Sequence, residues 1–92
     1  MIMDTVVRMP SQSDQATVRA VLLYLRGTGW RVSPGQRYNV AGTLLTVTAV
    51  SNPYGNEGLE LRIGVHAGQS DRLIATLCYD PRRKELAETI WH

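Results

Sequence analysis

The side chains that could act as nucleophiles or general bases are few in this sequence. It holds one cysteine, Cys78, and two histidines, His66 and His92. A thiol nucleophile needs a histidine within hydrogen-bond reach. The strand pairing predicted below separates Cys78 from His66 by about 20 Å, at about 3.3 Å per residue along a strand. The pattern does not fix the position of the terminal His92, so it does not exclude a pair with Cys78 by distance. Cys78 lies in an apolar predicted strand, which is typical of a small buried side chain.

The sequence supports a metal site or a hydrolase site no better than it supports a thiol nucleophile. A zinc site needs three or four converging His, Cys or carboxylate ligands, and neither histidine has a second ligand at a metal-binding spacing. His66, Ser70 and Asp71 gather around one predicted turn, where serine and aspartate are ordinary turn residues. We expect His66 to be a solvated residue at a strand end. The sequence therefore predicts no enzyme activity, no metal and no cofactor.

Length and composition set the scale of the fold. The chain has 92 residues, 43% of them hydrophobic and 20% charged, with a formal net charge of +2. This is enough for one hydrophobic core, so we expect a single domain over residues 1–92. The longest apolar run is residues 20–25, whereas a membrane-spanning helix needs about 20 residues. The chain does not start with a basic stretch followed by an apolar one, so no secretory signal is expected and a cytoplasmic location is predicted.

A helix is predicted over residues 12–26. Ser11, with Asp14 three residues later, resembles a capping box at the start of this helix. Gly27 and Gly29 follow the segment and are typical of a helix end. Apolar residues recur at helical spacing and form one stripe. The members of the stripe are Val18, Val21, Leu22 and Leu25.

The next segments predict a β-hairpin. Residues 37–40 and 43–50 are separated by an alanine and a glycine, which suits a two-residue turn. This turn pairs Tyr38 with Leu45, so both side chains are expected to face the core. Residues 30–33 precede the hairpin and are expected to form a short strand.

A second hairpin carries the clearest pattern in the chain. Apolar and polar residues alternate over residues 59–66 and again from Leu73 to Tyr79. Pairing Ile63 with Ala75 brings the apolar residues of both strands onto one face. A slip of one residue would move one of the two sets to the other face, so the pattern predicts this hairpin strongly.

The last residues, 80–92, fit two structures. Asp80-Pro81 is typical of a helix start. Three cations follow at residues 82–84, and cations are unfavourable in the first turn of a helix. The alternative is a strand that extends the second hairpin, with Leu77 opposite Ala87. The sequence favours the helix and leaves the strand open.

These elements predict an α+β fold, with one N-terminal helix packed on an antiparallel meander of about four strands and a short C-terminal helix or an extra strand. The core is expected to take one face of the sheet. Its predicted members are Val18, Val21, Leu22, Leu25, Trp30, Tyr38, Leu45, Val47, Leu59, Leu61, Ile63, Val65, Leu73, Leu77 and Trp91.

The other face of this sheet is predicted to mix arginine with apolar and hydroxyl side chains. Arginine is enriched where proteins contact one another. A long polar loop, residues 51–58, adds a tyrosine. We therefore expect a non-enzymatic binding protein (an inhibitor, adaptor or accessory subunit) that contacts another protein or forms a homodimer. The predicted contact residues are Arg37, Leu44, Thr46, Thr48, Tyr54, Arg62, Arg72 and Ile74.

Nucleic-acid binding is the alternative function. Nine of the ten basic residues are arginine, and residues 8–37 hold five arginines against one acidic residue. Such a surplus can contact phosphates. The small net charge, and the lack of aromatic residues on the polar side of the second hairpin, count against a single-strand stacking platform. The predicted phosphate contacts are Arg19, Arg26, Arg31, Arg37, Arg82, Arg83 and Lys84.

Overall fold

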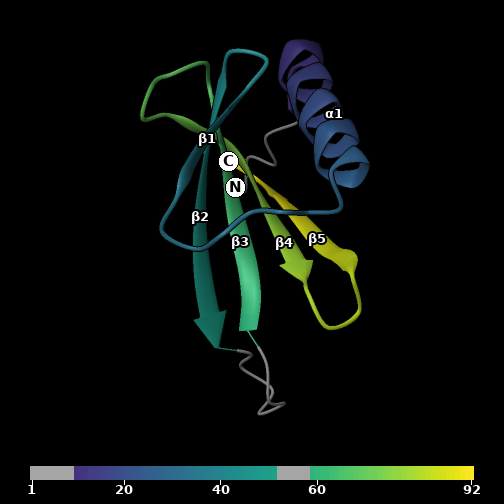
Figure 1. The fold of residues 1–92 in the computed structure, drawn as a ribbon. Helices are drawn as coiled ribbons and strands as arrows, with labels where there is room; N and C mark the ends of the chain where they lie inside the picture. The colour runs from purple at the N-terminus through teal and green to yellow at the C-terminus, as the bar shows by residue number, and fades with distance from the viewer. Residues whose placement is uncertain (1–9, 52–58) are drawn as a thin grey trace, which may run out of the picture.

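The computed structural model of the chain describes residues 10–51 and 59–92. Helix α1 (Gln12–Gly27) is followed by five strands that form one antiparallel sheet, and the strands follow one another across the sheet in chain order (Figure 1). The predicted α+β meander is confirmed, with one strand more than expected. The strands are β1 (Arg37–Val40), β2 (Thr43–Ser51), β3 (Leu59–His66), β4 (Leu73–Asp80) and β5 (Glu85–Trp91).

Helix α1 begins and packs as the sequence predicts. The backbone N–H of Asp14 donates to the hydroxyl oxygen of Ser11 at 3.1 Å, which satisfies one of the N–H groups left open at a helix start. Val18, Val21 and Leu25 are buried in the same hydrophobic cluster as the sheet residues. This stripe therefore fixes which side of the helix faces the sheet.

β1 and β2 pair in the predicted register, with Tyr38 opposite Leu45. The two connecting residues, Ala41 and Gly42, have φ angles of 50° and 80°. Positive φ at both positions gives the twist that a two-residue hairpin requires. Glycine adopts this conformation readily because it has no Cβ.

β3 and β4 pair two residues away from the predicted register. Ile63 lies opposite Leu77 rather than Ala75. A shift of two residues leaves each side chain on its original face. The apolar side of this hairpin is therefore the side that the sequence predicts, although the partners differ.

A bulge near the β3–β4 turn changes which residues of β4 are buried. The register shifts between Val65 and His66, which places Leu73 opposite His66. Leu73 is 37% exposed and Ile74 only 3% exposed. The predictions of a core Leu73 and an accessible Ile74 are therefore wrong, because a bulge inserts one unpaired residue and re-aims the side chains beside it.

The C-terminal segment is a strand, so the favoured helix is wrong. β5 pairs with β4, with Leu77 opposite Thr89, two residues from the register considered for the alternative strand. One carboxylate oxygen of Asp80 accepts hydrogen bonds from the backbone N–H groups of Arg82 and Arg83, at 2.9 and 3.3 Å. The aspartate that suggested a helix cap therefore closes a hairpin turn, which is another common role of this side chain.

Residues 30–33 form no strand, contrary to the prediction. Trp30 has a φ of 58°, in the left-handed region, and its N–H donates to the backbone carbonyl of Leu25 at 2.8 Å. The Trp30 ring stacks on that of Tyr79, with centroids 4.2 Å apart and planes inclined by 12°. This stack anchors the connection that runs from α1 across the sheet to β1 (Figure 1).

The core lies between α1 and one face of the sheet. Leu45, Ile63 and Leu77 are fully buried within it. Leu59 and Trp91 are exposed, contrary to the prediction. Each is the terminal residue of its strand, where fewer neighbours cover a side chain.

Gly64 gives a test of the packing on the side of the sheet turned away from α1. A Cβ there would approach Thr46 Oγ1 to 2.7 Å and Leu73 Cδ2 to 2.9 Å. We expect Gly64→Ala to lower the free energy of unfolding by about 1–3 kcal/mol, measured by urea denaturation. Gly27→Ala is the matched control, since a Cβ there meets no atom within 4 Å and alanine favours helix. Unchanged stability of Gly64→Ala would contradict the packing described.

Candidate functional site

Helix α1 carries more apolar residues than one side of a helix can bury. Residues 21–25 are all apolar apart from the tyrosine hydroxyl, and five consecutive residues point in all directions around a helix of about 3.6 residues per turn. The sheet covers Val21 and Leu25. Leu23 and Tyr24 remain outside, 65% and 48% exposed. The helix therefore presents apolar side chains to solvent as well as to the core.

A cleft opens beside these two side chains, between the end of α1 and β1. Its volume is about 520 Å³. Tyr38 is held at one wall because its hydroxyl accepts a hydrogen bond from the backbone N–H of Ser33 at 2.8 Å. Gly27 leaves open space, since a Cβ there would meet no atom within 4 Å. The described residues that line the cleft are Tyr24, Gly27, Thr28, Arg31, Val32 and Tyr38.

We define the helix-end surface as Leu23, Tyr24, Arg31 and Tyr38. Leu23 stands one turn before Gly27, which lines the cleft, and residues four apart lie on one side of a helix. The surface thus combines exposed apolar side chains, a cleft and the guanidinium of Arg31.

Charge is unevenly divided between the two described parts of the chain. Residues 10–51 hold four arginines and one acidic residue, Asp14, whereas residues 59–92 hold five basic and five acidic residues. The ion pairs that join one described residue to another lie in the second part, between Arg62 and Glu60 and between Arg83 and both Asp80 and Glu85. The four arginines of the first part therefore have no carboxylate partner among the described residues. These arginines are Arg19, Arg26, Arg31 and Arg37.

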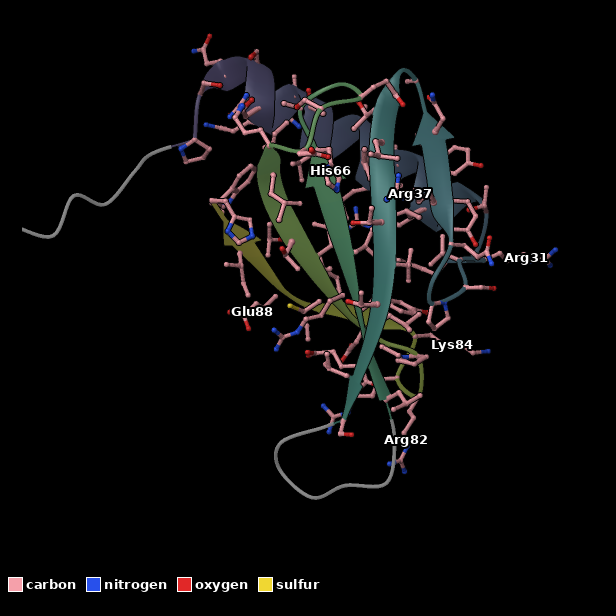
Figure 2. All side chains as sticks on the ribbon, turned by 90° about the vertical axis from the view of Figure 1, so that its left-hand side faces the viewer. Arg31, Arg37, His66, Arg82, Lys84 and Glu88 are labelled. Atoms are coloured by element: carbon pink, nitrogen blue, oxygen red, sulfur yellow. The ribbon has the colours of Figure 1, made fainter. Side chains whose placement is uncertain are left out.

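Several residues predicted for protein contact do share one surface, the outer sheet face, which we define as the side of the sheet turned away from α1. Arg37 lies opposite Thr46, and Thr48 lies opposite Arg62. Figure 2 looks toward β2 and labels Arg37 there. Leu44 lies on the same side of β2, because it is two residues from Thr46, and is partly buried.

Other predicted contact residues are not on this face. Ile74 is buried in the core cluster, so its side chain is not available to a partner. Arg72 lies in the β3–β4 turn, where its backbone carbonyl accepts from the N–H of Ala67 at 2.8 Å. Tyr54 lies outside the described residues.

His66 is a structural residue rather than the solvated one that was predicted. It is 8% exposed. Its Nδ1 lies 3.0 Å from the backbone carbonyl of Ser70, and its Nε2 lies 3.1 Å from Thr46 Oγ1. A carbonyl only accepts, so Nδ1–H donates to it, and in the neutral ring Nε2 accepts from the threonine hydroxyl. The Ser70 hydroxyl donates to the carbonyl of Ala67 at 2.7 Å, so this group closes the turn.

Cys78 is fully buried on the outer sheet face, between Arg62 of β3 and Glu88 of β5. Burial raises the pKa of its thiol, Glu60 raises it further, and Arg62 opposes both effects. His92 Nε2 instead contacts Thr76 Oγ1 at 2.7 Å. In the described part of the chain no hydrogen bond joins the thiol to either imidazole.

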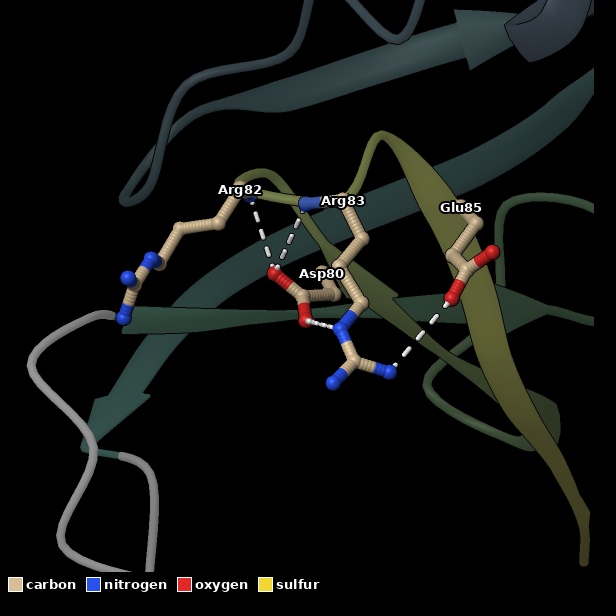
Figure 3. Close-up of polar contacts among 4 residues, drawn as sticks. All are labelled: Asp80, Arg82, Arg83 and Glu85. Atoms are coloured by element: carbon tan, nitrogen blue, oxygen red, sulfur yellow. Dashed lines mark hydrogen bonds and ion pairs between the residues drawn. The ribbon is translucent and has the colours of Figure 1, made fainter.

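The cations predicted for phosphate contact are spread over the molecule. Figure 2 shows Arg31 and Lys84 pointing to one side and Arg82 lying at the far end, away from Arg37. Figure 3 shows the turn between β4 and β5, where Arg83 pairs with two carboxylates, those of Asp80 and Glu85, at 3.9 Å. The cations labelled in Figure 2 therefore do not all lie on one side of the molecule.

Comparisons with protein families, curated proteins and solved structures find no match for this chain. Within residues 10–51 and 59–92, no group of three or more His, Cys, Asp or Glu side chains converges to hold a metal ion. No helix in these ranges is long and apolar enough to cross a membrane. The assignment of function therefore depends on the surfaces described above.

The sequence pattern did not predict Leu23, Tyr24 or the cleft as a contact surface. The signal was present, because an unbroken apolar run in a helix must leave some members outside a two-layer core. Arg31 was predicted as a contact, although for nucleic acid. The cleft itself depends on the path of the connection after α1, which alternation and spacing do not describe.

The burial of Cys78 predicts a thiol that reacts slowly in the folded protein. Because its pKa is raised above the usual value of about 8.5, the thiolate is scarce at neutral pH, and the side chain is also shielded. We expect a thiol reagent such as Ellman's reagent to label the native protein far more slowly than the urea-unfolded protein. Equal labelling rates in the two states would contradict this burial.

Proposed function

We propose that this protein is a non-enzymatic binding module that contacts a protein partner through the helix-end surface. The observation that carries the proposal is the exposed pair Leu23 and Tyr24 beside a cleft. Tyrosine and arginine are the residue types most often found, with tryptophan, at the energetic centres of protein interfaces. The cleft brings two tyrosines and Arg31 together.

Covering Leu23 would give a partner a direct energetic gain. Transfer of a leucine side chain from water to an apolar environment is worth about 1.5–3 kcal/mol. Leu23 is the most exposed large apolar side chain among the described residues, at 65%. Because Leu23 lies one turn before Gly27 of the cleft, one segment of a partner could cover both Leu23 and the cleft.

The outer sheet face is the second choice for the contact surface because its polar groups already bind one another. Arg62 is paired with Glu60 at 3.0 Å, and Thr46 is hydrogen-bonded to His66. A partner there would have to compete with these contacts. We therefore place the main contact on the helix-end surface and leave Arg37, Leu44 and Thr48 as a secondary candidate.

A heterologous partner is favoured over a second copy of the chain. A twofold dimer places the same patch of both copies face to face. On the helix-end surface this would bring Arg31 close to its own equivalent without a carboxylate of the described residues between them. Nucleic acid is less well supported than protein because Arg37 lies away from the side to which Arg31 and Lys84 point (Figure 2).

The proposal is tested by capturing a partner and comparing variants of matched chemistry. The full chain is used to capture proteins from its source cells, and the affinity of the captured protein is then measured after purification. Leu23→Asp should weaken that affinity by about tenfold or more, since 1.4 kcal/mol corresponds to tenfold. Leu59→Asp is the control, because Leu59 is another exposed leucine, 53% accessible, at the start of β3.

Circular dichroism of each variant shows whether the fold is retained. Both substitutions are at exposed positions, so both proteins should fold like the wild type. Equal affinities for the wild type and Leu23→Asp, or equal losses in Leu23→Asp and Leu59→Asp, would reject the helix-end surface as the contact.

A further inference from the structure

We infer that the helix-end cleft binds an acidic segment of a partner protein, one that brings an apolar side chain next to a carboxylate. This inference rests on the function proposed above and adds the chemistry of the partner. The carboxylate would bind Arg31, and the apolar side chain would contact the tyrosine rings of the cleft, Tyr24 and Tyr38.

Three backbone carbonyls at the end of α1 already accept hydrogen bonds from the same chain. The backbone carbonyl of Tyr24 already accepts from the N–H and the hydroxyl of Thr28, at 3.0 and 3.1 Å. The carbonyls of Leu25 and Arg26 accept from Trp30 and Gly29 N–H groups. The end of α1 thus satisfies these acceptors internally, as helix ends commonly do.

The side-chain donors at the cleft include the guanidinium of Arg31 and the tyrosine hydroxyls. Arg31 is exposed and forms no ion pair with a described residue. The Tyr38 hydroxyl accepts from Ser33, which leaves its own proton free to donate. A ligand that pairs with these donors must carry hydrogen-bond acceptors. A carboxylate is such a ligand, because an arginine guanidinium can bind it through two parallel hydrogen bonds.

The charge around the cleft favours the same ligand. Arg31 lines it, and the one acidic residue of the described range 10–51, Asp14, lies in the first turn of α1, far from its end. An acidic segment would supply the carboxylate that Arg31 lacks among the described residues. Charge complementarity of this kind also steers association and excludes basic partners.

The shape and the apolar groups favour protein over a phosphate chain. The cleft has about 520 Å³, within the range of about 300–1,000 Å³ found for ligand sites. Val32 adds aliphatic surface beside the tyrosine rings, and the exposed Leu23 lies one turn before Gly27 on α1. An aliphatic or aromatic side chain fills such a surface, whereas a nucleic-acid backbone offers it little.

The test is a selection of short random peptides, displayed on phage, against the full folded chain. We expect enrichment of sequences that combine aspartate or glutamate with a neighbouring leucine, isoleucine, phenylalanine or tryptophan. The best peptide is then synthesised with a fluorescent label, and its affinity is measured by anisotropy. Arg31→Glu should weaken binding by about tenfold or more, and Arg31→Lys by less, because lysine keeps the charge and loses the fork.

Two further variants separate the cleft from general electrostatics. Gly27→Trp fills the open space at the cleft without a backbone conflict, and should abolish binding. Arg72→Glu reverses an exposed charge in the β3–β4 turn, and should leave the affinity within about twofold. Circular dichroism confirms that each variant is folded.

The outcomes distinguish this inference from the proposed function. If no enriched peptide binds the Gly27→Trp variant more weakly than the wild type, both the helix-end contact and the acidic partner are rejected. If the peptides depend on Gly27 and are neutral or basic, or bind Arg31→Glu unchanged, only the acidic partner is rejected. Binding of a fluorescein-labelled oligonucleotide that is lost in Arg31→Glu, without any enriched acidic peptide, would also overturn it.

Discussion

The packing of α1 on the sheet is the constraint from which the other features of the molecule follow. Val18, Val21 and Leu25 are buried, and this fixes the rotation of the helix about its axis. Leu23 and Tyr24 must then point outward, because neighbours in a helix are about 100° apart. The stack of Trp30 on Tyr79 holds the connection to β1 in place. The cleft between the helix end and β1 results from these two contacts together.

Ion pairing differs between the two described parts of the chain. In residues 59–92, Arg62 and Arg83 bind carboxylates of the same chain, although such exposed pairs add little stability. Arg31, in the connection after α1, has no carboxylate partner among the described residues. It lines the same cleft as the exposed Tyr24, and this coincidence supports the proposed function.

Periodic features were predictable from the sequence, and irregular ones were not. The stripe of α1, the pairing of β1 with β2 and the apolar side of β3 and β4 follow from the sequence pattern, because burial of one face imposes that spacing. The exact partners of β3 and β4 did not follow from it. The bulge beside Val65 was not predictable, since it inserts a residue without changing the alternation of either strand. The left-handed Trp30 and the turn role of Asp80 were missed because each residue type favours several local structures. His66 was misplaced because its burial depends on Thr46, which is distant in sequence.

The most direct test of the account is a measurement of solvent access to the two sides of α1. A soluble gadolinium chelate speeds the relaxation of exposed nuclei, and it can be added to dilute protein that carries labelled leucine, valine and tyrosine side chains. The account predicts strong relaxation at Leu23 and Tyr24 and protection at Val21 and Leu25. Protection of Leu23 equal to that of Leu25 in the monomer would mean that the helix is rotated or covered, and the helix-end surface would not exist.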